Sequence, residues 1–142
     1  GAPPPVDLKI ERRNGDFVRA QITNRQVVSC HDISDGGLLV AIAEMALASM
    51  TPSGFMLGAL LHFDTDLPLH AFAFGEDQGR YIVEINPNRT EELLAAAAFA
   101  NVPARRLGRC GGEALTINGE QTIPLSLLRR AHEGWLPNYM AG

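Results

Sequence analysis

The chain has 142 residues, 46% of them hydrophobic and 20% charged, with a formal net charge of −4. This composition is typical of a globular domain and excludes an intrinsically disordered chain. The acidic balance, without a long basic run, argues against a nucleic-acid-binding surface. No apolar run approaches the roughly 20 residues of a membrane span, and no signal peptide is evident. These observations predict a cytoplasmic protein.

The first five residues, GAPPP, cannot form the middle of a helix or a central strand, because three consecutive prolines lack backbone donors. We interpret residues 1–5 as a linker that arrives from a missing upstream part of a longer protein. Residues 6–142 are then expected to form a single domain. Between 6 and 22, apolar residues recur at helical spacing and favour one helix of about 16 residues. The Asn14–Gly15 pair is the weak point, because it also suits a hairpin turn.

The next segments alternate between extended and helical patterns. Residues 26–30, QVVSC, are β-branched and apolar and predict a short buried strand. From residue 36 onward, apolar residues follow a helical stripe that ends before the Pro-Ser-Gly break at 52–54. Residues 55–63 and 80–85 predict two further strands. The two cysteines, Cys30 and Cys110, show no metal or redox spacing, and both are expected to be reduced core thiols.

The second half predicts a helix over 91–100, with Asn88 or Thr90 as its N-cap. Short strands are expected at 104–110 and 114–117, the latter followed by an Asn118–Gly119 turn. A last helix is expected to begin at Pro124 or Ser126 and to close the chain. Trp135 and Tyr139 on that helix are expected to be packing residues. The interleaved pattern indicates an α/β or α+β fold, with a mixed sheet of about four to six strands covered by helices.

The densest polar chemistry lies in the stretch HDISDGG, directly before the apolar helix. If the strand continues through it, Asp32 and Ser34 point to one face, and His31 and Ile33 point to the other. Ser34 or Asp35 would then cap the following helix. The alternation also separates the serine from the histidine, which argues against a nucleophilic Ser-His-Asp arrangement. None of the four histidines, at 31, 62, 70 and 132, has metal-ligand spacing with another.

Two consecutive glycines, Gly36 and Gly37, would leave backbone amides open to a phosphate oxygen at the start of this helix. Mg²⁺ prefers one or two carboxylates together with phosphate oxygens, and Asp32 is placed to supply one. The stretch therefore predicts a magnesium–phosphate element. An ordinary strand-to-helix turn with a capping aspartate explains the same spacing, and the spacing alone favours that simpler interpretation.

A second polar cluster, FGEDQGRY, occupies residues 74–81. Glu76, Gln78 and Arg80 lie between two glycines just before a predicted strand. Such a loop could hold a ligand or contact a neighbouring domain, and it could equally be a solvated turn. The sequence leaves the role of these three residues open.

The stretch HDISDGGLLVAIAEMA resembles the signature of the C-terminal domain of the aminoimidazole ribonucleotide synthetase superfamily. The segments GAPPPVDLKIERRNGDFVR, FGEDQGRYIVEI, VPARRLGRCGG and PLSLLRRAHEGWLP narrow the resemblance. Together they are similar to small-type synthetase subunits of the phosphoribosylformylglycinamidine synthase family. The resemblance covers nearly the whole chain, and the fold that it implies is a sheet covered by helices on one side.

The resemblance implies an ATP-dependent carbon–nitrogen ligase of de novo purine biosynthesis. Such enzymes phosphorylate the amide oxygen of formylglycinamide ribonucleotide with ATP, and ammonia from glutamine displaces the phosphate. Carried over by motif, Asp32 would help to hold Mg²⁺. Ser34 would meet the nucleotide, together with Asp35, Gly36 and Gly37. The resemblance implies no catalytic residue in this chain, because most catalytic residues of the family lie in the upstream ATP-binding domain.

The implied partners are that upstream domain, a glutamine amidotransferase subunit and a small adaptor subunit. Self-association of the isolated domain is also expected, through an apolar surface that the missing domain would otherwise cover. Two other interpretations stay open. The chain could be a stand-alone binding or structural module without chemistry, or the same domain from another member of the superfamily. The reading frame upstream of residue 1 would distinguish the module from a part of a ligase.

Overall fold

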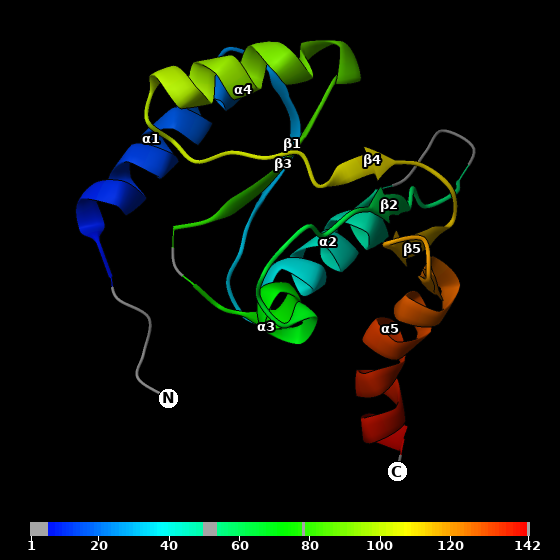
Figure 1. Ribbon diagram of the computed structural model, residues 1–142. Helices are drawn as coiled ribbons and strands as arrows, with labels where there is room; N and C mark the ends of the chain where they lie inside the picture. The colour runs from blue at the N-terminus through cyan, green and yellow to red at the C-terminus, as the bar shows by residue number, and fades with distance from the viewer. Residues whose placement is uncertain (1–5, 50–53, 78, 142) are drawn as a thin grey trace. The chain divides into compact units, whose positions relative to one another are not determined.

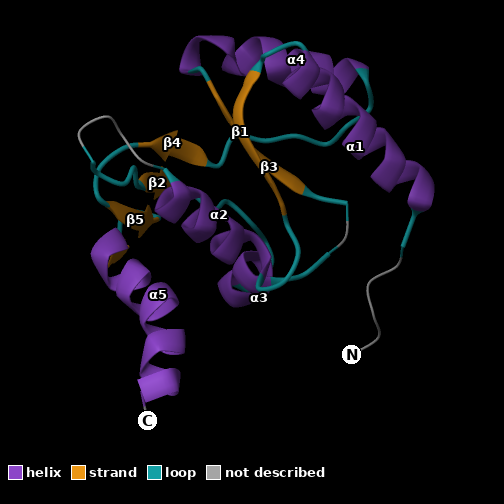
Figure 2. Ribbon diagram, turned by 180° about the vertical axis from the view of Figure 1, so that it is seen from behind, coloured by secondary structure: helices purple, strands orange, loops and turns teal. Residues whose placement is uncertain are grey.

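The computed structural model describes residues 6–49, 54–77 and 79–141 (Figure 1). The expected linker at 1–5 and Gln78 therefore lie outside the described residues. The chain divides into two compact units, one formed by Gly1–Ile42 with His70–Arg106 and the other by Ala43–Leu69 with Leu107–Gly142. Both units combine helices with strands, so the predicted mixed α/β class is confirmed (Figure 2).

The first helix, α1 (Leu8–Thr23), begins where the sequence predicts a helix and has the predicted length of 16 residues. Its N-cap is Asp7, whose carboxylate accepts hydrogen bonds from the amides of Lys9 (2.9 Å) and Ile10 (3.1 Å). The helix continues through Asn14–Gly15 because tertiary contacts support it there. The Asn14 side-chain nitrogen donates to the Gly79 carbonyl at 3.1 Å.

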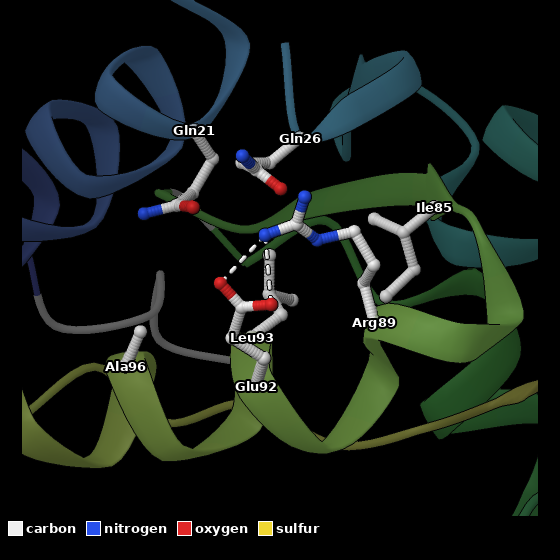
Figure 3. Close-up of a pocket in the computed structure, with 7 residues that line it drawn as sticks. All are labelled: Gln21, Gln26, Ile85, Arg89, Glu92, Leu93 and Ala96. Carbon is white, nitrogen blue, oxygen red and sulfur yellow. Dashed lines mark hydrogen bonds and ion pairs between the residues drawn. The ribbon is translucent and has the colours of Figure 1, made fainter. Parts of the chain in front are cut away.

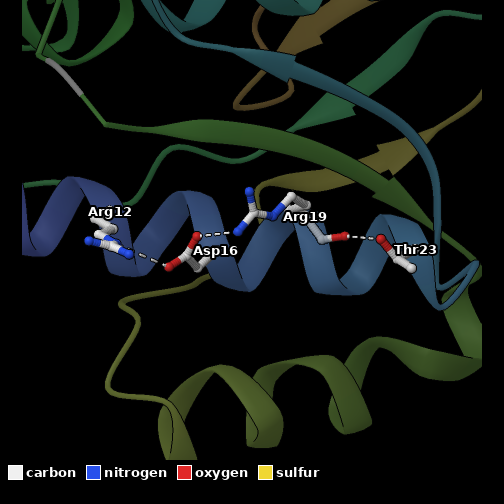
Figure 4. A network of polar contacts seen from close by, with 4 residues as sticks. All are labelled: Arg12, Asp16, Arg19 and Thr23. Carbon is white, nitrogen blue, oxygen red and sulfur yellow. Dashed lines mark hydrogen bonds and ion pairs between the residues drawn. The ribbon is translucent and has the colours of Figure 1, made fainter.

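The exposed face of α1 carries a short network of polar contacts (Figure 4). The carboxylate of Asp16 accepts from Arg19 at 2.6 Å and lies 3.7 Å from the Arg12 guanidinium. The Thr23 hydroxyl donates to the Arg19 carbonyl at 2.9 Å, one turn back. These solvent-exposed pairs on a helix contribute only tenths of a kcal/mol each. They solubilise the helix and define no site.

In the first unit, β1 (Val27–Asp32) pairs antiparallel with β3 (Tyr81–Ile85), from Val27 opposite Ile85 to Asp32 opposite Tyr81. The register shifts between Val27 and Ser29, which leaves Val28 exposed. The strand predicted at 26–30 is confirmed, but half-buried and exposed positions alternate along β1, so its predicted burial is wrong. The strand has this pattern because successive side chains point to opposite faces of the β1–β3 ribbon, and one of these faces is more exposed than the other.

Helices complete the first unit. They are the short α3 (Leu69–Phe74), a 3₁₀ turn (Pro87–Arg89), α4 (Thr90–Phe99) and the first half of α2 (Gly37–Ala48). Helices α1 and α4 lie side by side in both views (Figures 1 and 2). The helix at 91–100 is confirmed, but the expected cap is wrong. Asn86 caps the 3₁₀ turn, while the α4 N-cap, Arg89, makes no side-chain cap bond. The apolar residues buried in this unit are Ile33, Leu38, Ala41, Ile42, Phe72, Ala73, Ala97 and Val102.

The second unit holds a four-stranded mixed sheet in the order β4-β2-β5-β6, which confirms the predicted sheet type. Strands β2 (Ala59–Leu61) and β5 (Ala114–Ile117) are parallel, whereas β4 (Gly108–Cys110) and β6 (Gln121–Pro124) pair antiparallel with their neighbours. The predicted turn joins β5 to β6. Both Asn118 (φ 53°) and Gly119 (φ 74°) have positive φ, the pattern of a type I′ turn.

The last helix, α5 (Leu125–Ala141), begins between the two predicted start positions and contains Pro137. Its rings Trp135 and Tyr139 stack on each other at 5.5 Å, but both are exposed to solvent. The strand expected at 55–63 is reduced to three residues, and α3 and β6 have no counterpart in the sequence-based prediction. Both cysteines are reduced thiols, as expected, yet both are exposed, so their assignment to the core is wrong.

Candidate functional site

The candidate site is the connection between β1 and α2, within the first unit. Strand β1 ends at Asp32, whose side chain is 65% exposed, and Ser34 is also exposed. Between them Ile33 is buried, with 7% of its surface exposed. The predicted alternation is therefore confirmed. The side chains of Asp32 and Ser34 are open to solvent, and the apolar residue between them anchors the connection in the core.

The helix after this strand begins later than predicted. Helix α2 starts at Gly37, not at Ser34 or Asp35. The positive φ of Gly36 (81°) and Gly37 (74°) interrupts the right-handed path between Asp35 and the helix. The Gly37 amide donates to the Ser34 carbonyl at 3.0 Å, which closes a turn. Among the described residues, neither Ser34 nor Asp35 makes a side-chain cap bond to α2. The expected capping role of Asp35 is wrong.

The two glycine amides are not left open either, as the sequence analysis expected. The Gly36 amide donates to Oε1 of Glu76 at 2.8 Å. Glu76 belongs to the FGEDQGRY cluster, so the two polar clusters that the sequence singled out meet here. Forty residues separate Gly36 from Glu76, and nothing in the local sequence of either cluster indicates this pairing.

The loop that carries Glu76 is held at several points. The Arg80 guanidinium donates to the Gly75 carbonyl at 2.6 Å and lies 3.4 Å from the Asp77 carboxylate. The Arg80 carbonyl accepts the Ile33 amide at 2.9 Å, which fastens the end of the loop to the end of β1. Arg80 therefore positions Glu76 by bonding to the residues on both sides of it.

Next to the turn, the ring of His31 lies close to the following residue. Its Nδ1 is 2.6 Å from the Asp32 carbonyl oxygen and 3.6 Å from Oδ1 of the Asp32 carboxylate. The Cys30 thiol lies one residue further back. Partial burial raises the pKa of this thiol, and the Asp32 carboxylate raises it further. The thiol therefore stays protonated at neutral pH and is not an activated nucleophile.

The residues of the β1–α2 connection are suited to supply one carboxylate ligand to a magnesium ion. No group of three or more His, Cys, Asp or Glu side chains in the described part of the chain is arranged to hold a metal. The side chain of Asp32 offers an exposed carboxylate, the hard oxygen donor that Mg²⁺ prefers. Because Mg²⁺ is usually bound by one or two carboxylates plus phosphate oxygens, Asp32 suffices only if a phosphate or another part of the protein completes the shell.

A small hollow elsewhere in the first unit contains none of these residues (Figure 3). Arg89 donates to both carboxylate oxygens of Glu92, at 2.6 and 2.7 Å, and the Gln26 side chain lies opposite. Oε1 of Gln26 is buried without a hydrogen-bond partner among the described residues. The hollow measures about 30 Å³, which is room for one or two waters. It suits a structural water better than a ligand.

Comparison with known proteins places the chain in a family. A family model described as AIR synthase related protein, C-terminal domain, matches residues 1–117. The chain belongs to this family. The phosphoribosylformylglycinamidine synthase subunit PurL of Parvibaculum lavamentivorans is 55% identical over 140 residues, 99% of this chain. The PurL subunit of Methylocella silvestris is 54% identical over 141 residues. The resemblance inferred from the sequence is thereby confirmed.

Each of these two matches covers 18% of the relative, so the chain spans about a fifth of the length of the curated relatives it matches. Solved structures agree in fold. The PurLQS structure from Thermotoga maritima superposes with a TM-score of 0.73 at 18% identity, over 87% of this chain and 22% of that one. T. maritima PurL complexed with ATP gives 0.68 at 18% identity, over 82% and 21%. The family fold extends over the greater part of the chain.

Proposed function

We propose that this chain is the C-terminal part of a PurL-type synthetase that uses ATP to convert formylglycinamide ribonucleotide to formylglycinamidine ribonucleotide in purine biosynthesis. One observation carries this proposal: 55% identity to a PurL subunit along 99% of the chain. Structures of T. maritima PurL complexed with FGAR, ATP, AMPPCP and ADP are consistent with the substrate and the nucleotide.

Within that enzyme we assign the β1–α2 connection to binding a magnesium–nucleotide complex. Asp32 would supply a carboxylate to the metal, and the Ser34 hydroxyl would contact the nucleotide from the same exposed face. Asp35, Gly36 and Gly37 would form the turn against which the phosphates lie. The burial of Ile33 supports this role, because it fixes the positions of the two flanking side chains. When bound, the metal would offset phosphate charge.

The remaining parts of the proposal concern what lies outside the chain. An upstream domain of the same protein would bind the ATP that is consumed, and it would contribute the catalytic residues. A glutamine amidotransferase subunit would supply ammonia, and a small adaptor subunit would join the two. The enzyme would act in the cytoplasm. No helix in the described residues is long and apolar enough to cross a membrane.

The full-length gene product tests the proposal. Incubated with formylglycinamide ribonucleotide, ATP, Mg²⁺ and ammonia, it should form the amidine product and ADP. It should also restore growth without purines to a bacterium that lacks its own PurL subunit. The 142-residue chain alone should do neither, because the catalytic residues would lie in the upstream domain. Turnover by the isolated chain, or none by the full-length protein with its partner subunits, would contradict the proposal.

A further inference from the structure

The hydrogen bond between Glu76 and the Gly36 amide bears on whether this turn accepts free nucleotide or its metal complex. A backbone amide in a glycine-rich turn is where a phosphate oxygen would be expected to bind. Here the amide already donates to a carboxylate oxygen, at 2.8 Å. The carboxylate has the charge sign and the acceptor character of a phosphate oxygen, so the two ligands would compete for one donor.

The carboxylate is held in place by the loop. Arg80 bonds to the Gly75 carbonyl and lies near the Asp77 carboxylate, on either side of Glu76. The Asn14 side chain, on α1, donates to the Gly79 carbonyl at 3.1 Å. Because the loop is fastened on both sides of Glu76, the carboxylate remains close to the turn even when its hydrogen bond breaks.

The charges around the turn also oppose the binding of a bare phosphate group. Asp32 and Asp35 belong to the β1–α2 connection, Glu76 bonds to it, and Asp77 follows Glu76 in the loop; all four are exposed. Opposite them the loop supplies one guanidinium, that of Arg80, which already lies against Gly75 and Asp77. A bare polyphosphate approaching this turn therefore meets repulsion, whereas a polyphosphate that carries a divalent cation meets attraction from the same carboxylates.

We infer that Glu76 acts as a specificity-determining residue: its carboxylate occupies the Gly36 amide and makes nucleotide binding at this turn depend on a divalent cation. The inference rests on the proposed nucleotide site. It adds that the site selects the metal–nucleotide complex over the metal-free nucleotide. Metal-free nucleotide must displace Glu76 against repulsion. The metal complex offsets that repulsion, because its cation neutralises part of the phosphate charge and is attracted by the surrounding carboxylates.

The test is calorimetric titration of the full-length protein with ATP in EDTA and with Mg-ATP. It uses wild type, Glu76→Gln and Glu76→Ala, with Glu120→Gln as a charge-matched control in the β5–β6 turn. For Mg-ATP, subtracting the heat measured in an Asp32→Asn background isolates this site from any other nucleotide site. For metal-free ATP, the difference between the Glu76 variants and wild type reports on this site. We expect metal-free ATP to bind about three- to tenfold more tightly to Glu76→Ala, a gain of up to about 1.4 kcal/mol. Glu76→Gln should gain less, and the control should match wild type.

Hydrogen exchange supplies a readout that needs no ligand. In the unliganded protein, the peptide that contains Gly36 should exchange faster in Glu76→Ala than in wild type, because its amide loses its acceptor. If Mg-ATP binds at this site but Glu76→Ala weakens metal-free binding or leaves it unchanged, the inference is overturned and the proposed site stands. If no Asp32-dependent nucleotide binding occurs in wild type or in any variant, both are overturned.

Discussion

The α-carbon of Gly37 lies directly against the backbone of Phe74, the last residue of α3. A Cβ added at Gly37 would be 2.6 Å from the Phe74 carbonyl carbon and 2.7 Å from its Cα. The opposing atoms are backbone, so no side-chain rotation can relieve the contact. The glycine therefore permits the close approach of the β1–α2 turn to the segment that leads into the Glu76 loop.

Gly37→Ala should destabilise the protein strongly, for two reasons. The residue has φ 74°, which costs an L-residue roughly 1–2 kcal/mol. The clash with Phe74 adds to this cost, and we expect a total loss of about 3 kcal/mol in the free energy of unfolding. Gly119→Ala is the matched control, since Gly119 also has φ 74° but has open space around it. Urea unfolding of both variants measures the difference, and equal losses would show that the Phe74 contact is not limiting.

Asp32→Asn should weaken binding of the magnesium–nucleotide complex in the full-length protein without changing the fold. The side chain is 65% exposed, so its packing contribution is small. Loss of a charge-assisted contact corresponds to about ten- to a hundredfold in affinity. Ser34→Ala should reduce affinity by about fivefold, because a neutral hydroxyl contact is worth nearer 1 kcal/mol. Nucleotide titration together with thermal melting checks both variants.

Asp35→Ala distinguishes a binding turn from a capping turn. A capping aspartate would cost about 1 kcal/mol of stability when truncated. Helix α2 instead starts at Gly37, and no described contact ties the Asp35 side chain to it. We therefore expect the free energy of unfolding of Asp35→Ala to lie within about 0.5 kcal/mol of the wild-type value.

The Asp32 variant tests the site itself. If Asp32→Asn binds the magnesium–nucleotide complex like wild type, the site assignment is wrong and the stretch is only a turn.

Local sequence signals predicted the long elements well. Helix α1 follows from its helical periodicity, and the strand at 81–85 follows from its alternating β-branched residues. The start of α2 was misplaced because Asp35 is a favourable capping residue on propensity alone. The two following glycines adopt positive φ and override that preference. Propensity describes each residue separately, whereas the turn is decided by the whole segment.

The contacts between distant segments could not be predicted in the same way. Strand β1 pairs with β3 across some fifty residues, and Glu76 reaches Gly36 across forty. Neither pairing leaves a periodicity or a local motif in the sequence. The composition of the Glu76 loop marked it as unusual, but only the fold shows that it closes over the glycine turn. The exposure of Cys30 likewise depends on how the β1–β3 ribbon is packed, because Cys30 lies on its exposed face.

Arg80→Lys should loosen the loop that carries Glu76. The guanidinium reaches both the Gly75 carbonyl and the Asp77 carboxylate, and the side chain is only 30% exposed. A lysine ammonium is a point donor without the planar fork, so it cannot keep both contacts. We expect a loss of about 1 kcal/mol in unfolding free energy, with faster hydrogen exchange at 75–77. Arg129→Lys on α5 is the control, and a similar loss there would show that arginine contacts in general carry the effect.

The isolated 142-residue chain should self-associate through apolar side chains of its first unit. Phe99 at the end of α4 is 93% exposed, and Val28 in β1 is 70% exposed. Large exposed apolar side chains commonly mark contact surfaces. Phe99→Ser should therefore shift sedimentation towards the monomer, whereas the neighbouring Ala98→Ser should not. Strictly monomeric behaviour of the wild-type chain at high concentration would contradict the expectation.

The Cys30 thiol reports on the charge of Asp32 without any ligand. Its pKa is raised by partial burial and then by the Asp32 carboxylate. A raised pKa means that the folded state holds the thiol proton more tightly. This contribution to stability is therefore complete below the ordinary thiol pKa, and it is lost as the pH rises through the folded value.

Asp32→Asn removes the second of these causes and should lower the pKa of the Cys30 thiol. In a Cys110→Ser background, iodoacetamide should then alkylate Cys30 about two- to fivefold faster at pH 8, because more thiolate is present. The acceleration should vanish above the pKa of the thiol, where both variants are fully ionised. High salt should shrink it, since the thiol and the carboxylate are both partly exposed. An unchanged rate at pH 8 and low salt would show that the carboxylate does not act on this thiol.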